Sequence, residues 1–169
     1  YGDVFYQKRP YDVAQIEKYS DEIMIMAYDL HKSRGEPGPN FPLSAGKKYG
    51  YGYDLLFADL EKVVPAEKIT IIFGMYGYDW KVDEKGRPIT LATSITTAQV
   101  VANYIKKCSS INCTVLKDPI SSETEINYVD EDGKYHIIWF ENEGSVGKKE
   151  EFLRQRGVGS VAFWAFGYF

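Results

Sequence analysis

Two short, continuously apolar runs constrain the fold of this chain more than any other feature. Residues 23–28 (IMIMAY) and 69–73 (ITIIF) are apolar without alternation, and charged residues precede each run. Both runs have the length of a strand rather than of a helix. Strands that are covered on both faces lose the polar alternation of half-buried strands. The two runs therefore predict two buried parallel strands.

The segments around these runs predict the connecting helices. Residues 53–62 (YDLLFADLEK) have helical spacing and end before Pro65, so that strand, helix and strand form a parallel βαβ unit. Residues 1–9 are typical of a strand end or an extended entry. Ser145 is the predicted cap of a later helix, which Gly157 ends. The predicted helices span 11–19, 53–62 and 145–156, and a third strand spans 160–164.

The character of the chain changes after Trp80. Residues 81–90 are polar, a helix is predicted over 97–107 with Thr96 or Thr97 as its cap, and a hairpin is predicted with Asp132-Gly133 at its tip. The hairpin strands span 126–129 and 135–140. We interpret 81–141 as a small α+β module inserted into a larger α/β fold. The long Gly- and Pro-rich loop 33–43 is of the kind that is functional or a linker.

Three parallel strands fit either a doubly wound sheet or part of a (β/α)8 barrel. In such barrels the chemistry lies at the C-terminal ends of the strands. Polar and aromatic side chains gather at these ends in the sequence, and they are Tyr28, Asp29, Tyr76, Tyr78, Trp80 and Trp164.

The aromatic share is high, at 15%, with 14 Tyr, 9 Phe and 3 Trp. Aromatic rings stack on flat apolar faces such as those of sugars, although composition alone favours a Tyr-rich core and surface. The net charge of −4, with scattered Lys and Arg, argues against a nucleic-acid or anionic-membrane partner. No apolar run is long enough to span a bilayer. No signal peptide is recognisable, but the sequence opens at Tyr1 without Met, so a leader could have been removed.

Two features bear on metals and redox state. Cys108 and Cys113 are five residues apart, which is compatible with a disulfide and equally with two buried thiols, so the compartment is left open. His31 and His136 are far apart and no Cys or Asp spacing supports a metal site. We expect no metal and no cofactor.

Five motifs, in collinear order, resemble the C-terminal half of the barrel in family 18 of the glycoside hydrolases. The resemblance covers nearly the whole chain and lies nearest to the spore-cortex and peptidoglycan branch rather than to secreted chitinases. It implies a barrel segment 1–80 (end of strand five to strand seven), an α+β insertion 81–141, and a barrel segment 142–169 (helix seven and strand eight). The motifs are 26–29 (MAYD), 39–43 (PNFPL), 64–69 (VPAEKI) with 76–80 (YGYDW), 139–142 (WFEN) with Ser145 and Lys149, and 157–164 (GVGSVAFW).

The sequence departs from the family pattern at some positions. Ile72 and Gly74 stand where the seventh strand usually has Gly-x-Pro, and Ser160 replaces a glycine. The largest departure is that no Asp-x-x-Asp-x-Asp-x-Glu run occurs, and the final Glu of that run is the family's proton donor. We therefore expect this chain to lack the catalytic acid, and the isolated segment to be inactive and to dimerise, swap or pack against another chain through its open strand edges.

The resemblance implies a role for each candidate residue. Tyr28 would hydrogen-bond the substrate's acetamido carbonyl, and Asp29 would bind the acetamido edge or a hydroxyl. Trp164 would form the floor under the sugar at subsite −1. The remaining candidates would line the cleft or orient a neighbour, and they are Met26, Tyr76, Trp80 and Glu141. Without the resemblance these positions indicate an ordinary strand end, core packing or, for Glu141, a surface ion pair.

Two functions follow as alternatives from the resemblance. One is part of a glycosidase that cleaves an N-acetylglucosamine polymer, peptidoglycan or chitin, by substrate-assisted retaining hydrolysis. The other is a non-catalytic, lectin-like relative that keeps the aromatic cleft. Both imply an N-acetylated oligosaccharide or polysaccharide as the partner. An extracellular, cell-wall or spore-coat location rests on the resemblance alone.

Overall fold

A computed structural model describes residues 11–169, and the segment predicted over 1–9 lies outside the described residues. Strands β1 (Ile23–Ala27), β2 (Ile69–Gly74) and β8 (Ser160–Trp164) form a parallel sheet in the order β1-β2-β8. The strands predicted at the two apolar runs and over 160–164 are thereby confirmed. Helix α1 (Val13–Lys18) precedes β1 and begins at Asp12, whose side chain accepts a hydrogen bond from the Gln15 N–H.

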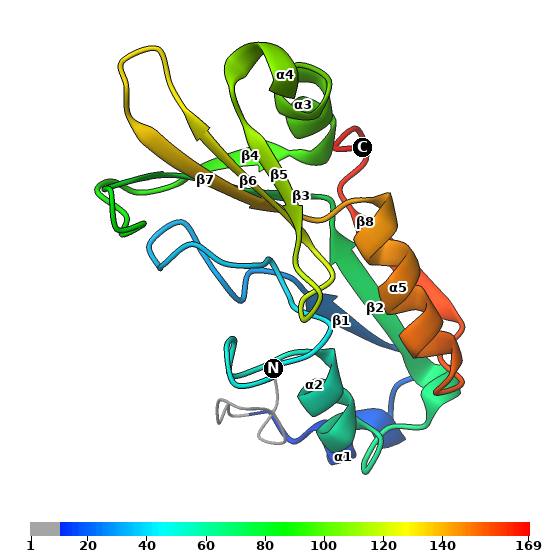
Figure 1. The fold of residues 1–169 in the computed structure, drawn as a ribbon. Coiled ribbons are helices and arrows are strands. Elements are labelled where there is room, and N and C mark those ends of the chain that lie inside the picture. The colour runs from blue at the N-terminus through cyan, green and yellow to red at the C-terminus, as the bar shows by residue number, and fades with distance from the viewer. Residues whose placement is uncertain (1–10) are drawn as a thin grey trace.

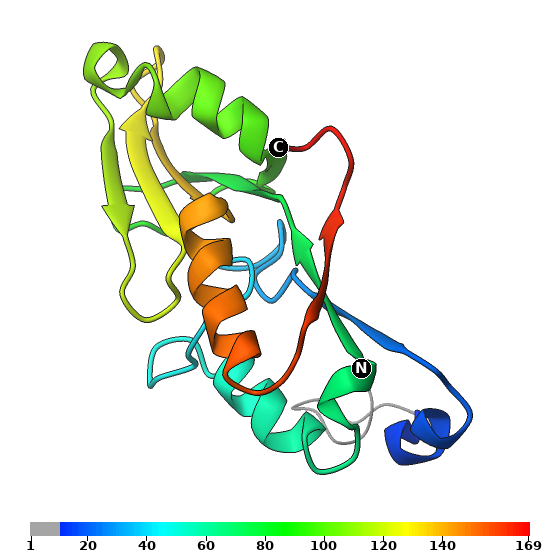
Figure 2. The ribbon, with the colours of Figure 1, turned by 90° about the vertical axis from the view of Figure 1, so that its right-hand side faces the viewer.

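Helices α2 (Tyr53–Leu60) and α5 (Glu143–Arg154) lie along one face of this sheet (Figures 1 and 2), and a 3₁₀ turn (Ala66–Lys68) leads into β2. One core joins the helices to the strands. Its fully buried members include Tyr53, Phe57 and Leu60 of α2 with Ile69, Ile71 and Phe73 of β2. Because side chains alternate across a strand, these strand positions all point to the helix-covered face.

The opposite face of β1 is exposed among the described residues. Met24 and Met26 each keep 54% of their surface accessible, whereas Ala27 is buried. The prediction that this strand is covered on both faces, and the alternative of core packing for Met26, are therefore wrong for the described structure, whereas the cleft role of Met26 stays a prediction. The physical reason is that α2 and α5 cover only one side of the three-stranded sheet.

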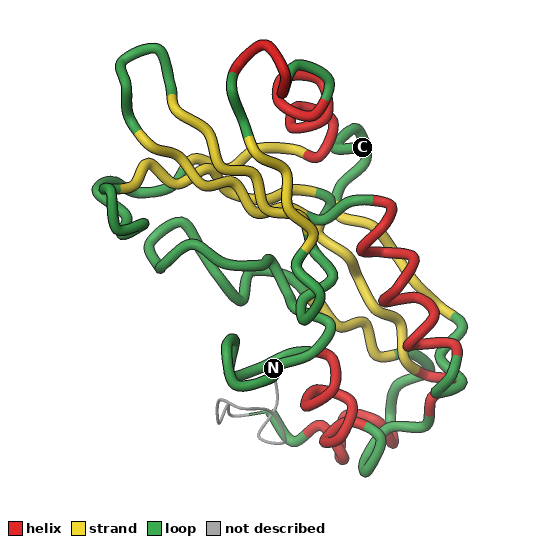
Figure 3. Tube along the Cα trace, viewed as in Figure 1, coloured by secondary structure: helices red, strands yellow, loops and turns green. Residues whose placement is uncertain are grey.

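A second sheet is antiparallel and has five strands in the order β4-β3-β7-β6-β5. The strands are β3 (Tyr76–Val82), β4 (Thr93–Thr96), β5 (Thr114–Lys117), β6 (Thr124–Val129) and β7 (Tyr135–Phe140), and Figure 3 shows them as the upper group. The predicted hairpin corresponds to β6 and β7 and is confirmed. Strands β3, β4 and β5 were not predicted. The predicted module boundary at residue 81 stays a prediction, and β3 runs across it.

A single residue, Met75, separates β2 from β3 and thereby joins the two sheets. Its N–H donates to the Trp164 carbonyl at 2.6 Å, and its carbonyl accepts from the Thr97 N–H at 3.1 Å. Two residues further on, a Cβ on Gly77 would lie 1.8 Å from the Trp139 carbonyl oxygen, so glycine is required where β3 passes β7.

Capping residues define the remaining helices. Helix α3 (Thr97–Val100) begins at Thr96 in a capping box with Gln99, continues into a π-helical turn (Val101–Ile105), and is followed by α4 (Cys108–Ile111). Helix α5 begins at Asn142 rather than at the predicted Ser145, because Ser145 is the third helical residue and the two side chains cap each other's backbone N–H.

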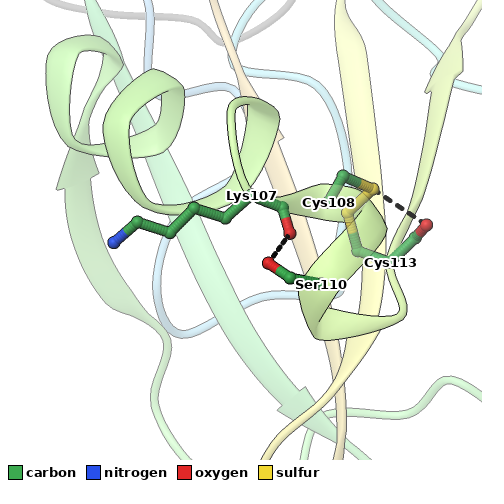
Figure 4. Close-up of a disulfide and its surroundings, with 4 residues drawn as sticks. All are labelled: Lys107, Cys108, Ser110 and Cys113. Carbon is green, nitrogen blue, oxygen red and sulfur yellow. Dashed lines mark hydrogen bonds between the residues drawn. A yellow bond between two sulfur atoms is a disulfide. The ribbon is translucent and has the colours of Figure 1, made fainter.

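Cys108 and Cys113 form a disulfide that closes the short α4 turn (Figure 4), where the Ser110 hydroxyl also donates to the Lys107 carbonyl. The alternative of two free thiols is thus excluded in this structure. Across residues 11–169, every helix is too short or too polar to cross a membrane.

Candidate active site

The C-terminal ends of the three parallel strands bring the predicted site residues to one edge. Ala27 pairs with Phe73, and Gly74 pairs with Trp164. Extending the register of β1 by one residue places Tyr28 beside Gly74, so Tyr28 and Trp164 flank a residue without a side chain. Alternation then puts them on the same face of the sheet as Met26.

Gly74 keeps the space between the strand ends open. A Cβ at this position would lie 2.8 Å from the Tyr28 Cβ and 2.8 Å from the Tyr76 Cε1. The rings of Tyr28 and Tyr76 meet edge to face with centroids 6.0 Å apart. Trp164 has 53% of its surface exposed, so its ring is available for stacking.

Asp29 receives hydrogen bonds from two phenols. Its Oδ1 accepts from the Tyr76 hydroxyl at 2.5 Å and from the Tyr78 hydroxyl at 2.8 Å. Its backbone lies in the left-handed region, with φ of 62°, which Asp tolerates better than most residues. Within residues 11–169 the second oxygen, Oδ2, has no hydrogen-bond partner and can accept from a ligand. An outlying backbone at a polar strand end is typical of functional sites.

The environment keeps both phenols protonated. Burial, followed by the hydrogen bond to Asp29, raises the pKa of Tyr76, and the same two causes raise the pKa of Tyr78 to about 12. Burial and the nearby Asp29 also raise the pKa of Tyr28. At neutral pH all three hydroxyls can therefore act as donors. Those of Tyr76 and Tyr78 stabilise the Asp29 carboxylate through charge-assisted hydrogen bonds.

A buried polar network lies beneath the loop that follows Asp29. The Asn40 side chain accepts from the Asp29 N–H at 2.7 Å, and the Asn40 N–H donates to Glu123 Oε2 at 2.6 Å. Lys149 of α5 donates to Glu123 Oε1 at 2.8 Å and forms a second short ion pair with Glu141. The four residues Asn40, Glu123, Glu141 and Lys149 are all buried.

Two carboxylates share one ammonium in this network. Burial raises the pKa of Glu141 to about 7; Lys149 opposes that rise and the repulsion of Glu123 adds to it. Burial alone would lower the pKa of Lys149, but the attraction of the two carboxylates outweighs it and raises that pKa. Lys149 thus stays charged, while Glu141 is the group that takes up a proton most readily.

Two predicted cleft residues do not reach the surface. Trp80 has no exposed area, because its ring packs beside Val82 and Trp139 and its Nε1–H donates to the Gly35 carbonyl at 3.0 Å. Glu141 is 1% exposed and is a buried partner of Lys149. The predictions that these two residues contact sugar, and the alternative of a surface pair for Glu141, are corrected by their burial.

Sequence reasoning missed the contribution of β4. A cavity of about 120 Å³ lies between the strand ends and this edge strand, and its lining residues are Tyr76, Ser94, Ile95, Thr96, Trp164 and Tyr168. Tyr76 and Trp164 were predicted, but a short polar strand such as 93–96 gives no hydrophobic pattern that could have revealed it. In the part of the chain that is described, no three His, Cys, Asp or Glu side chains are grouped to hold a metal ion.

Comparison with known proteins identifies a family. The sequence model described as "Glycosyl hydrolases family 18" matches residues 1–168. The chain is 30% identical over 158 residues to the uncharacterised glycosylase YvbX of Bacillus subtilis, covering 94% of this chain and 42% of that protein. It is also 30% identical over 148 residues to a cortical fragment-lytic enzyme of Bacillus anthracis, covering 87% of this chain and 31% of that protein.

Solved structures are similar over nearly the whole chain. The putative sporulation-specific glycosylase YdhD of Bacillus subtilis superposes with a TM-score of 0.75 at 26% identity, over 96% of this chain and 50% of that one. The spore cortex-lytic enzyme SleL of Bacillus cereus gives a TM-score of 0.76 at 26% identity, over 93% and 34%. The chain thus spans between about a third and a half of the length of these relatives.

Proposed function

The chain belongs to family 18 of the glycosyl hydrolases, and from that premise we propose that it is part of a hydrolase of N-acetylglucosamine-containing polysaccharide, peptidoglycan or chitin. Relatives named as cortical fragment-lytic and spore cortex-lytic enzymes support peptidoglycan as the substrate. A chitinase of Chromobacterium violaceum, with a TM-score of 0.69 at 27% identity, supports chitin.

We propose further that the chain forms about strands six to eight of a (β/α)8 barrel, with the α+β module inserted before the last helix. Parallel strands β1, β2 and β8 with helices on one face are the arrangement of a barrel wall. The exposed face that carries Met24 and Met26 would be the barrel interior. In a complete barrel the remaining strands would cover this face.

In the proposed mechanism, the acetamido oxygen of the substrate attacks the anomeric carbon while an acid from the remainder of the barrel protonates the leaving oxygen. Tyr28 donates to that acetamido group and holds it in line for attack. Asp29, through Oδ2, accepts from the acetamido N–H and stabilises the positive charge that develops on the resulting ring. Trp164 stacks under the sugar, and Tyr76 keeps Asp29 oriented.

The observation that carries this proposal is that Tyr28, Asp29 and Trp164 lie at the same ends of neighbouring parallel strands, with Gly74 leaving room between Tyr28 and Trp164. A carboxylate with one oxygen saturated by two phenols and the other available to a ligand is suited to binding a polar N–H beside an aromatic platform.

The test is turnover of cortex peptidoglycan fragments and of chitooligosaccharides by the full-length protein. We expect Asp29→Asn and Tyr28→Phe to lower kcat about 10²- to 10³-fold, and Trp164→Ala to raise KM about tenfold through loss of stacking. Matched controls are Tyr135→Phe, on β7, and Tyr19→Ala, an aromatic that is 88% exposed beyond α1. Neither control should change kcat or KM by more than about twofold.

The controls decide how a loss of activity is interpreted. If the control variants lost as much activity as the site variants, the strand-end site would be refuted. Binding of the oligosaccharides without any turnover by the wild-type full-length protein would instead identify a lectin-like relative.

A further inference from the structure

Asn40 is a buried side chain with a complete set of partners. It is 2% exposed. Its Oδ1 accepts from the Asp29 N–H at 2.7 Å, and its Nδ2 donates to the carbonyls of Gly74 and Tyr76, each at 3.2 Å. Its own carbonyl accepts from the Leu30 N–H at 2.8 Å. Because nothing of this side chain reaches the cleft, Asn40 can affect a ligand only through the groups that it holds.

The groups held by Asn40 are those that orient the Asp29 carboxylate. One side of the amide fixes the backbone of Asp29 in its left-handed conformation, which costs about 1 kcal/mol or more unless the surroundings enforce it. The other side holds the backbone on both sides of Met75, where Tyr76 begins β3 and donates its hydroxyl to Asp29. A single side chain therefore sets the acceptor and one of its donors relative to each other.

Glu123 in turn anchors Asn40. Its two oxygens accept from the N–H groups of Asn40, at 2.6 Å, and Phe41, at 2.8 Å, although 83 and 82 residues separate them in sequence. Glu123 has no exposed surface and Lys149 neutralises it. The loop after β1 is thus fastened to the loop before β6 and to α5 by charge-assisted bonds in a dry environment, where such bonds are strong.

We propose that Asn40 is a positioning residue that presents Asp29 to the substrate, and that Glu123 is its anchor. The proposal rests on the proposed function, because the reaction it serves is the one inferred above. Every bond in the chain Glu123–Asn40–Asp29 is between buried or half-buried groups, so solvent cannot replace a lost partner without rearrangement.

The decisive experiment is a double-mutant cycle in the full-length protein on chitooligosaccharide. Asn40→Ala should lower kcat about 10²-fold, the loss that a displacement of about 1 Å causes, and change KM less than about threefold. Adding Asn40→Ala to Asp29→Asn should cause no further loss, because Asn40 acts only through Asp29. Multiplicative losses in the double variant would overturn the proposal.

A control separates positioning from stability. Thr97→Val removes another buried hydrogen bond, from Thr97 to the Glu141 carbonyl at 2.6 Å, and leaves the Asp29 loop untouched. It should lower Tm about as much as Asn40→Ala does and leave kcat within about twofold. If Thr97→Val reduced kcat as strongly, Asn40 would be a structural residue only.

Amide hydrogen exchange provides a readout that does not depend on turnover. The Asp29 N–H should exchange about tenfold faster in Asn40→Ala than in wild type. Its exchange rate should be unchanged in Thr97→Val. Unchanged exchange in Asn40→Ala would overturn the proposal. If the wild-type protein cleaved no substrate, the proposed function would fail while exchange still decided whether Asn40 holds Asp29.

A second variant covers the case in which Asn40→Ala does not fold. Glu123→Gln preserves the shape of the anchor but exchanges one acceptor oxygen for an N–H donor. It should accelerate exchange at the N–H groups of Asn40 and Phe41 and lower kcat about tenfold. Faster exchange with full kcat would refute the link from the anchor to the reaction.

Discussion

Removing the buried ammonium of Lys149 should be among the most destabilising single changes in the chain. Its Nζ lies 2.8 Å from Glu123 Oε1, which corresponds to an attraction of about 6 kcal/mol at an effective dielectric constant of about 20. Desolvation of both ions offsets most of this attraction, so the net contribution of the intact pair to the free energy of unfolding is close to zero. Lys149→Met leaves two buried carboxylates without their cation, and such a break costs about 3–5 kcal/mol. Since whole domains are stable by only about 5–15 kcal/mol, the loss is large.

The deficit of this variant should depend on pH. The pKa of Glu141 is raised to about 7 from a usual 4.5, so the stability that its protonation contributes is complete below pH 4.5 and lost as pH rises through 7. Without Lys149 the pKa of Glu141 rises further, because the main influence that opposes burial and Glu123 is then removed. The carboxyl accepts a proton at pH 5, and the cost of Lys149→Met should be smaller there than at pH 8.

Urea unfolding at pH 5 and pH 8 measures both effects as free energies of unfolding. The matched control is Lys148→Met, which removes the adjacent, exposed ammonium and should change the free energy of unfolding by less than about 0.5 kcal/mol. Equal losses in the two variants, or a Lys149→Met deficit that does not change with pH, would refute the account of a charged, buried triad.

Three further outcomes are expected. Gly74→Ala should cost about 1–3 kcal/mol, because its Cβ would lie 2.8 Å from the nearest tyrosine carbon, whereas Gly147→Ala, with open space around it in α5, should stabilise by about 0.5–1 kcal/mol in thermal unfolding. Burial works against the ionisation of Asp118, but hydrogen bonds from the Ser121 N–H and Lys48 outweigh it and lower the Asp118 pKa to about 2. The ionised carboxylate contributes less than about 1 kcal/mol to folding stability, because Lys48 is half exposed, and this contribution is present above pH 3.8 and lost towards pH 2. Asp118→Asn should therefore flatten the acid limb of a pH–stability curve. The isolated 169-residue segment should show no hydrolysis and should self-associate in sedimentation, and either turnover or a dilute monomer would contradict this expectation.

The parallel sheet could be predicted from the sequence because two of its three strands are unbroken apolar runs. Residues 69–73 are buried on the helix side and largely on the other, as a run such as ITIIF requires. The same rule failed for the degree of burial of Met24 and Met26. An apolar run indicates that a strand can be covered on both faces, but in the described residues helices cover only one face of the sheet.

The antiparallel sheet was harder to predict. Strand β3 (YGYDWKV) contains glycine and an acid and follows β2 after one residue, so its start was not separable from the preceding strand. Strand β5 (TVLK) is exposed along its whole length, and its two apolar residues, Val115 and Leu116, are adjacent, so no alternating pattern marks it as a strand. Trp80 was assigned to the cleft because aromatics at strand ends suit sugars, but alternation along β3 turns it into the small core beside Trp139.

At the site, motif order predicted which residues meet at the strand ends, whereas their support escaped prediction. Asn40 and Glu123 lie in two loops that are 83 residues apart, and neither has a periodic pattern. The signal that could have found them is the combination of an Asn before an aromatic in a Gly- and Pro-rich loop with a Glu beside a hairpin strand. Such a combination becomes meaningful only when the two loops are seen in contact.

The junction at Met75 has a consequence for how a ligand would enter. With its N–H held by one sheet and its carbonyl by the helix that follows β4, this linker has no slack through which one sheet could swing against the other. We therefore expect the cavity between Tyr76, β4 and Trp164 to be preformed, so that shape rather than closure of one sheet on the other would select a ligand there.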